Sequence, residues 1–150
     1  MSAARFRVSD AAAFLEGSWR IARRVRDRRL GESGSLVGKA CFTPIQDGLS
    51  YDEQGVLRFG AYIGEVTARY RFMEAEPGAM SVHFADGRPF HLLDLSSGLA
   101  EVAHDCAPDR YLGRYRALGP DSWTLAWRIR GPRKDMLIGT RYDRMIEAAG

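Results

Sequence analysis

Three histidines are the side chains in this chain best suited to proton transfer or to holding a ligand near neutral pH. They are His83, His91 and His104, and each lies in a short segment of alternating apolar and polar residues. In a β-strand, residues two apart share a face, so alternation shows which histidines lie with the apolar side chains. His91 shares the side of Leu93, and His104 shares the side of Val102. His83 falls on the opposite, outer side.

The turns between these segments predict how the histidines meet. A two-residue turn at Asp86-Gly87 would pair Val82 with His91. A turn centred on Ser97-Gly98 would then align the apolar sides of the next two strands and place His91 directly opposite His104. A slip of one residue would turn the whole apolar set outward, which burial opposes. We therefore expect both histidines to point inward and to face each other.

Other polar residues fall on the same inner face. A turn at Asp47-Gly48 would place Phe42 opposite Glu53 and Pro44 opposite Tyr51, with the last two pointing inward. The expected inner polar set is Tyr51, Glu53, Tyr70, His91, His104, Tyr111 and Tyr115, with Arg23 as a further candidate. Each buried polar group left without a hydrogen bond costs about 1–3 kcal/mol. These groups therefore need one another, water or a ligand.

This inner set suits two functions. The first is binding of a small, partly apolar molecule or cofactor, with its polar end held by His91 and His104. The second is a cofactor-free enzyme of isomerase, cyclase or decarboxylase type, with His91 or His104 as base and Glu53 or a tyrosine as acid. A packed core in which the polar groups satisfy one another is the structural alternative. The sequence carries no nucleophile motif, phosphate-binding loop or dinucleotide fingerprint.

Metal binding is a more specific alternative function for the same region. His91, His104 and Cys106 would lie on adjacent strands and could supply three zinc ligands, leaving one position open. A haem held by one of the histidines is a further alternative. We expect no metal by default, and the sequence does not identify a cofactor. Cys41 and Cys106 are expected on opposite faces and unbridged.

Basic residues lie in two kinds of place. Arg88, Arg133 and Lys134 occupy turns, where they would meet an anionic group of the ligand at the barrel rim. The first strand region is rich in arginine between positions 20 and 29, and the net charge is +3. No helix-turn-helix, zinc-finger or aromatic single-strand motif accompanies it, so a nucleic acid is not the expected partner. An interaction module using this strand is a third alternative, which predicts salt-sensitive binding to polyanions.

The elements that position these residues are mostly strands. Residues 9–17 predict a short helix with Ser9 as its N-cap. About nine strands follow, separated by Gly-, Pro- and Asp-containing turns. We expect one all-β domain over residues 1–150, an antiparallel up-and-down barrel of about 8–10 strands with a short N-terminal helix. The phase of the last strand, Met136 to Met145, is mixed on both sides.

The sequence also bears on location and partners. No apolar run approaches the ~20 residues of a membrane span, and the first residues lack the apolar segment of a secretory signal. We therefore expect a cytoplasmic protein with a small-molecule ligand and no membrane partner. A homo-oligomer is compatible with the sequence, which does not set the number of subunits.

A resemblance supports this fold. The Gly17-Ser18-Trp19 sequence after a short helix resembles the Gly-x-Trp that opens lipocalin and calycin barrels. In those barrels an arginine of the last strand packs over the tryptophan, which implies the same role here for Arg144 or Arg141. The segments 86–91, 104–111 and 131–135 resemble a small bacterial family known only as a domain of unknown function. That resemblance implies a calycin-like barrel over nearly the whole chain and assigns no catalytic residue.

Overall fold

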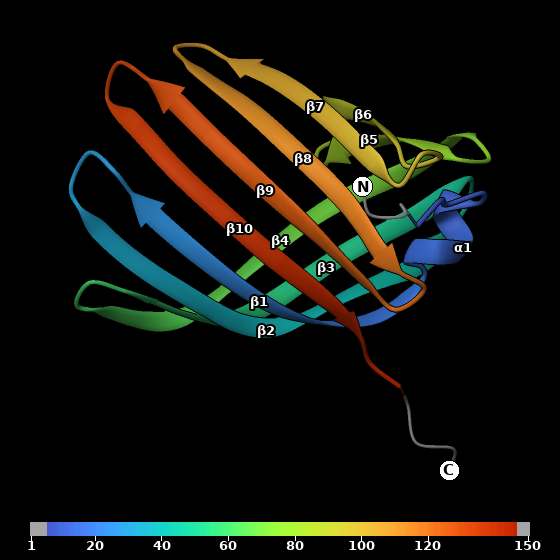
Figure 1. The fold of residues 1–150 in the computed structure, drawn as a ribbon, viewed down its shortest axis with the longest axis horizontal. Coiled ribbons are helices and arrows are strands. Elements are labelled where there is room, and N and C mark those ends of the chain that lie inside the picture. Colours follow the sequence, from blue (N-terminus) through green and yellow to red (C-terminus); the bar gives the residue numbers. More distant parts are fainter. Residues whose placement is uncertain (1–5, 147–150) are drawn as a thin grey trace, which may run out of the picture.

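The computed structural model describes residues 6–146, which form ten antiparallel strands and one short helix (Figure 1). The helix α1 spans Ala11–Leu15. The strands are β1 (Gly17–Asp27), β2 (Glu32–Ile45), β3 (Gly48–Phe59), β4 (Tyr62–Glu76), β5 (Ala79–Phe84), β6 (Pro89–Asp94), β7 (Leu99–Cys106), β8 (Asp109–Gly119), β9 (Ser122–Gly131) and β10 (Lys134–Arg144). The expected all-β, calycin-like barrel with a short N-terminal helix is confirmed. Residues 1–5, part of the stretch behind the cytoplasmic expectation, lie outside the described residues.

The strands form one sheet in the order β6-β5-β4-β3-β2-β1-β10-β9-β8-β7. The ladder between β1 and β10, with Trp19 opposite Arg144, joins the two ends of the chain. β6 and β7 are the two edges of the sheet and are not hydrogen-bonded to each other. The barrel is therefore nearly closed, with one seam that lacks a backbone ladder. Among the described residues, no helix is long and apolar enough to cross a membrane.

Helix α1 covers one end of the barrel (Figure 1). Leu15 and Trp19 are fully buried there, and the Trp19 indole N–H donates to the Leu15 carbonyl at 2.7 Å. The guanidinium of Arg144 lies 4.3 Å from the Trp19 ring centroid, which confirms Arg144, and not Arg141, as the arginine over this tryptophan. The expected N-cap was wrong by one residue, because the Asp10 carboxylate, not Ser9, accepts from the Ala13 N–H.

The hairpin between β2 and β3 has a different register from the one expected. Tyr51 lies opposite Phe42, and Ile45 pairs with Gly48, so the turn is Gln46-Asp47. Asp47 adopts the left-handed conformation (φ 61°) that aspartate tolerates. Gly48 stays inside the sheet, because a Cβ there would lie 2.3 Å from the Phe72 carbonyl oxygen. The shift equals two residues, so the predicted faces survive the wrong pairing.

The hairpin between β5 and β6 places Val82 opposite His91 as expected. His83 then pairs with Pro89, so the ladder skips Phe90 and forms a β-bulge. A bulge lets two successive residues turn toward one side, and here Phe90 turns inward beside His91. Simple alternation had placed Phe90 outside.

One expectation on the following strands is corrected. His104 pairs with Tyr111 across β7 and β8, so it does not face His91 in a ladder. Cys106 is exposed at the end of β7, and neither it nor Cys41 forms a disulfide. The structure also resolves the phase of the last strand, because Thr140 and Tyr142 are buried and face the interior.

Candidate functional site

A cavity of ≈ 210 Å³ lies inside the barrel. Its walls are mostly aromatic and aliphatic, with one polar cluster contributed by β1, β3 and β10. Its polar and aromatic lining includes Arg23, Tyr51, Glu53, Tyr70, Phe90, Tyr111, Tyr115, Trp123, Trp127, Thr140 and Tyr142. The predicted inner residues Tyr51, Tyr70, Tyr111, Tyr115 and Glu53 all line it. Neither His91 nor His104 does.

The polar cluster centres on a two-point ion pair. Arg23 Nη1 and Nη2 each donate to one oxygen of the Glu53 carboxylate at 2.7 Å, and Arg23 Nε donates to Thr140 Oγ1 at 2.8 Å. The side chains are only 18% and 5% exposed. Alternation of β1 brings Arg23 inward, whereas Arg24 on the same strand is exposed. The cavity thus carries a charged pair that is neutral as a unit.

Two tyrosines extend this cluster. The Tyr51 hydroxyl donates to Glu53, since a carboxylate can only accept. Because the Tyr51 hydroxyl proton is already donated to Glu53, the Tyr142 hydroxyl must be the donor in the 3.0 Å contact between the two phenols. Burial raises the pKa of Tyr142 to about 12, and burial also raises the pKa of Tyr51 well above its ordinary value. Both phenols therefore keep their protons at neutral pH and act as donors.

Glu53 is a carboxylate at neutral pH. Burial alone would raise its pKa, but the hydrogen bonds and charge of Arg23, with the Tyr51 hydroxyl, lower the pKa below its ordinary value. A carboxylate in this state cannot serve as a general acid, and its oxygens are already accepting three hydrogen bonds. The role of acid considered for Glu53 does not fit this geometry.

His91 is held in one tautomer by two neighbours. Its Nδ1 lies 3.0 Å from the Leu92 carbonyl oxygen, which can only accept, so Nδ1 carries the proton. Nε2 is then the acceptor for the Tyr115 hydroxyl, also at 3.0 Å. Burial lowers the pKa of His91 to about 4, with the hydrogen bond to Leu92 opposing this and the nearby His104 assisting it. His91 is thus a neutral ring that orients Tyr115.

Phe90 links the two histidines. Its ring centroid lies 4.7 Å from that of His91 and 5.1 Å from that of His104, in edge-to-face geometry. His91 is buried and His104 is half-buried, and both pack against Phe90 rather than against each other. His83 lies on the other face, where it bonds Ser81 and the Gly87 carbonyl.

Stacked aromatic rings form the part of the cavity wall opposite the polar cluster. Phe90 stacks on Trp127 at 5.3 Å with an interplanar angle of 10°, and Phe84 stacks on Phe90 at 4.5 Å. Deeper in the barrel, Trp123 stacks on Tyr142 at 3.7 Å. The Trp123 indole N–H is buried and finds no acceptor among the described residues. A ligand acceptor inside the cavity would satisfy this donor.

The predicted rim residues are spread over two turns. Arg88 is exposed, pairs with Asp86 at 2.7 Å and lies over the Phe84 ring. Lys134 lies 3.4 Å from an Asp109 carboxylate oxygen, and Arg133 is exposed. These turns lie at the end of the barrel away from α1 (Figure 1). None of the three residues lines the cavity.

The three-ligand metal arrangement does not form. Within residues 6–146, no three His, Cys, Asp or Glu side chains come together in a way that could hold a metal ion. His91, His104 and Cys106 are separated because Cys106 points to solvent at the end of β7. The tautomer of His91 also leaves no free ring nitrogen for a metal.

Sequence reasoning missed two parts of the site. Strict alternation from His91 would put Phe90 on the outer side, and the bulge that turns it inward has no sequence signal beyond Pro89. Trp127 was not among the inner residues singled out from the sequence, although alternation along its strand gives it the inner side. The pairing of Arg23 with Glu53 depends on the β1–β2–β3 register, where Ala40 lies between Trp19 and Glu53.

Comparison with known proteins places the chain in a family. Residues 15–144 match the family of unknown function DUF6314, to which the chain therefore belongs. A search of curated proteins finds no match. The family and the barrel agree with the resemblance noted from the sequence.

Solved structures share the fold at low identity. An S-type phycobiliprotein lyase, CPES, from Guillardia theta superposes with a TM-score of 0.68 and 9% identity, covering 97% of this chain and 96% of that chain. A DUF3598 protein of unknown function from Nostoc punctiforme gives 0.59 and 13%, over 89% of this chain and 49% of that chain. Rv2717c from M. tuberculosis gives 0.55 and 16%, over 91% and 96%. These similarities show the fold.

Proposed function

We propose that this protein binds a small, largely apolar and planar molecule inside the barrel, with a polar end that meets the Arg23–Glu53–Tyr51 cluster. The observation that carries the proposal is the ≈ 210 Å³ cavity with aromatic walls and one polar corner. An apolar cavity of about 150 Å³ is large enough for benzene. The cavity here therefore suits a one- or two-ring molecule, and part of a longer ligand would lie outside the cavity.

The polar corner indicates the charge of the ligand. Arg23 and Glu53 neutralise each other, so the corner offers hydrogen bonds rather than net charge. Trp123 contributes an unsatisfied N–H donor nearby. A neutral ligand with a carbonyl or similar acceptor matches this set. Arg88, Arg133 and Lys134 do not line the cavity, so they would meet only a group of the ligand that projects from the end of the barrel away from α1.

Binding is favoured over acid–base catalysis by the state of the two candidate residues. His91 has both ring nitrogens engaged and a pKa of about 4, so it is a weak base. Glu53 is ionised and cannot donate a proton. His104 is the remaining candidate base: it does not line the cavity itself but contacts Phe90, which does, and one protein with this fold, CPES, is a lyase. The enzymatic alternative accordingly rests on His104.

Filling the cavity tests the proposal. Ala68 lines the cavity from β4, whereas Thr67 beside it is exposed on the outer face. We expect the neutral two-ring fluorescent probe 6-propionyl-2-(dimethylamino)naphthalene, which carries a ketone acceptor, to bind the wild type saturably at one site. Ala68→Trp should weaken that binding at least tenfold, and Thr67→Trp should leave it unchanged. Equal binding by all three proteins would overturn the proposal. Native mass spectrometry of the purified protein then identifies any ligand that co-purifies.

A further inference from the structure

The outer surface of the barrel has one strongly basic wall. We call the outward positions of β8, β9, β10 and β1 the basic face. They carry the arginines Arg20, Arg24, Arg26, Arg110, Arg114, Arg116, Arg128, Arg130 and Arg141, against the two carboxylates Asp135 and Asp143. The outward positions of β3 and β4 are nearly balanced, with Arg58, Arg69 and Arg71 against Asp52 and Glu65. The molecule is therefore polarised, although its net charge is only +3.

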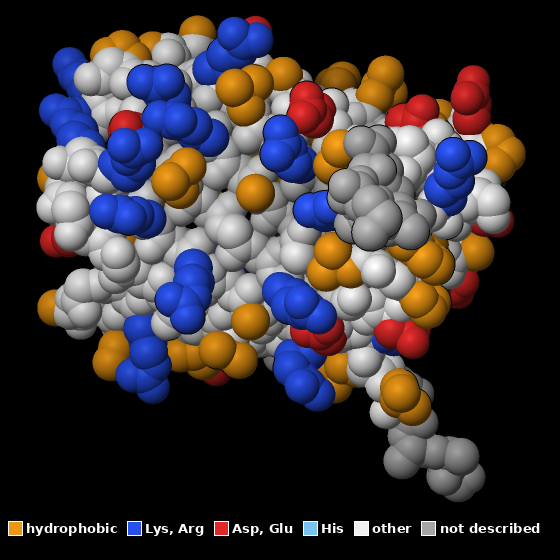
Figure 2. Space-filling view, viewed as in Figure 1, with side chains coloured by type: hydrophobic (Ala, Val, Ile, Leu, Met, Phe, Trp, Pro, Cys, Tyr) orange, Lys and Arg blue, Asp and Glu red, His pale blue; other side chains and the backbone are white. Residues whose placement is uncertain are grey.

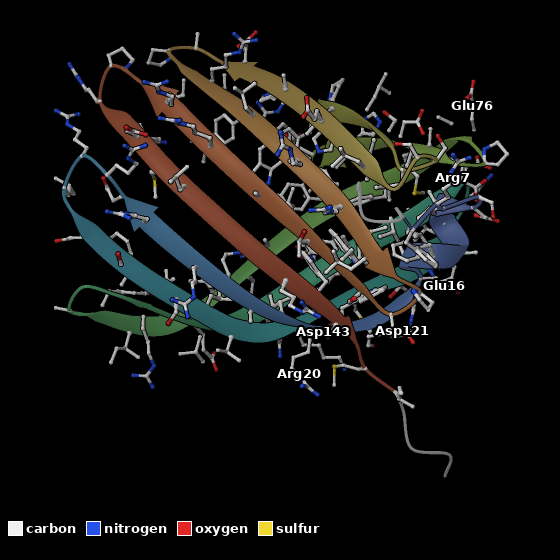
Figure 3. All side chains as sticks on the ribbon, viewed as in Figure 1. Arg7, Glu16, Arg20, Glu76, Asp121 and Asp143 are labelled. Atoms are coloured by element: carbon white, nitrogen blue, oxygen red, sulfur yellow. The ribbon has the colours of Figure 1, made fainter. Side chains whose placement is uncertain are left out.

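Much of this positive charge lacks an internal partner. Arg110, Arg114, Arg128 and Arg141 reach carboxylates at 3.6, 2.9, 3.9 and 3.1 Å. The other five arginines of the basic face make no ion pair with any carboxylate in residues 6–146. Figure 3 shows one of them, Arg20, directed away from the barrel. Exposed like charges without counter-ions favour an anionic partner.

The centre of the basic face is hollow. Ala126 pairs with Gly139, and Gly139 pairs with Arg24, so small residues occupy neighbouring strands at mid-sheet. Ala22 and Thr124 complete the floor of this depression, whose edges include Arg24 and Arg141. A Cβ built on Gly139 meets nothing within 4 Å. Figure 2 shows basic side chains around a bare central area on this side of the molecule.

Arginines line both sides of this hollow. Arg114 and Arg116 stand on β8, next to Ala126 and Thr124 on β9. Arg24 stands on β1 beyond Gly139 of β10. Three strand spacings of about 4.8 Å separate β8 from β1, so the two arginine rows are about 14 Å apart at their backbones. A narrow anionic ridge can lie in the hollow and receive guanidinium groups from both sides.

We infer that the basic face binds the phosphate backbone of a nucleic-acid duplex without reading its sequence. Arginine matches phosphate with two-point hydrogen bonds, and a duplex presents a continuous ridge of phosphates. The outward positions of these four strands carry no aromatic side chain, so they offer no platform for stacking the bases of a single strand. A flat bilayer would leave the hollow unfilled, and the face's leucines, Leu112, Leu118 and Leu137, are only 36–45% exposed.

The inference goes beyond the proposed cavity function and is independent of it. It also departs from the expectation from sequence, in which a nucleic acid was not the expected partner of the arginine-rich first strand. That expectation considered β1 alone, whereas the barrel places β8, β9 and β10 beside it. The arginines of β8, β9 and β10 lie 90–121 residues away from Arg20 in the chain and join it only in the fold.

Salt-dependent duplex binding tests the inference. Fluorescence anisotropy with a labelled 20-base-pair duplex of mixed sequence measures the affinity of the full chain between 50 and 200 mM salt. With about five phosphate contacts, the plot of log affinity against log salt should have a slope of about −4 to −5. The triple variant Arg24→Gln, Arg116→Gln, Arg130→Gln should bind at least tenfold more weakly and lose about 3 from the slope.

Two matched variants separate the hollow from general charge. Arg58→Gln, Arg69→Gln, Arg71→Gln removes the same charge from the opposite wall and should change affinity less than twofold. Gly139→Leu fills the hollow without changing charge and should weaken binding at least fivefold. Thermal melting checks that each variant is folded. Equal losses in both triple variants, no duplex binding at 50 mM salt, or binding to anionic vesicles in preference to the duplex would each overturn the inference.

Discussion

The Glu53 carboxylate is the ion-pair partner of the largely buried Arg23 guanidinium, so removing this carboxylate should lower the free energy of unfolding. Glu53→Gln leaves a guanidinium that is 18% exposed with a neutral partner. Breaking a buried ion pair by removing one partner costs about 3–5 kcal/mol. We expect a decrease of that size in the free energy of unfolding, measured by urea denaturation. Asp52→Asn, which breaks the neighbouring exposed pair with Arg69, should cost about 1 kcal/mol or less.

His91 should make stability depend on pH between its pKa in the folded protein and its ordinary pKa. Its pKa is about 4 in the folded protein and 6.5 ordinarily, so the unfolded chain binds the proton more readily. The contribution of His91 is fully present above pH 6.5 and is lost as the pH falls from 6.5 to about 4. The loss should approach roughly 3 kcal/mol.

The measurement compares the free energy of unfolding at pH 7.0 and 4.5 in three proteins. His91→Gln should show a smaller decrease over this range than the wild type. His83→Gln removes a partly exposed histidine from the outer face and should follow the wild type. The assignment fails if His91→Gln and the wild type lose stability equally.

Residue types and alternation predicted which polar side chains face inward, but not which partners they find. Tyr51, Glu53 and His91 were placed on the correct face because the face of a side chain follows from alternation along its own strand. The bond between His91 and Tyr115 joins β6 to β8, and the pair of Arg23 with Glu53 joins β1 to β3. The first contact depends on how β6 and β8 meet across the seam, and the second on the register of β1, β2 and β3, neither of which alternation encodes.

At the scale of elements, Arg144 ties the last strand to the helical end of the barrel. Its guanidinium donates to the carbonyls of Phe14 at 2.8 Å and Glu16 at 3.0 Å, and its Nε donates to Asp121. It also covers the Trp19 ring. Figure 3 shows Glu16 and Asp121 at this end of the barrel.

Arg144→Ala should therefore loosen α1 as well as β10. We expect a loss of about 2–4 kcal/mol, since hydrogen bonds to a charged group contribute about 1.5–3 kcal/mol and a cation over an aromatic ring adds more. Arg144→Lys should recover little, because a single ammonium cannot reach these acceptors together. Arg141→Ala, on the exposed side of the same strand, should lie within about 0.5 kcal/mol of the wild type. Chemical denaturation measures all three.

At two places, the pairing of neighbouring strands differs from the pairing that the sequence predicts. Asp47-Gly48 is a strong turn signal, yet Gly48 is used for close approach to β4 and the turn moves back by one residue. The bulge at Phe90 moves a side chain that strict alternation assigns to solvent. In both cases a tertiary contact decided the position of a residue whose local signal allowed two arrangements.

At the scale of the whole molecule, the seam between β6 and β7 should be the weakest line of the barrel. These two strands form no ladder with each other, so one row of backbone groups on each lacks a strand partner there. At this seam, His91 of β6 and His104 of β7 both pack against Phe90 of β6. Side-chain packing, rather than backbone hydrogen bonds, closes the barrel beside the cavity.

Hydrogen exchange followed by mass spectrometry should report this difference directly. Amides of β6 and β7 should exchange faster than those of β1 and β10, which have ladders on both sides. Because Phe90 lines the cavity, occupation by the neutral two-ring probe 6-propionyl-2-(dimethylamino)naphthalene should slow exchange at the seam and leave β1 unaffected. Uniform protection around the barrel would show that the seam is as stable as the ladders. Protection by the probe confined to the rim turns would place its binding outside the barrel.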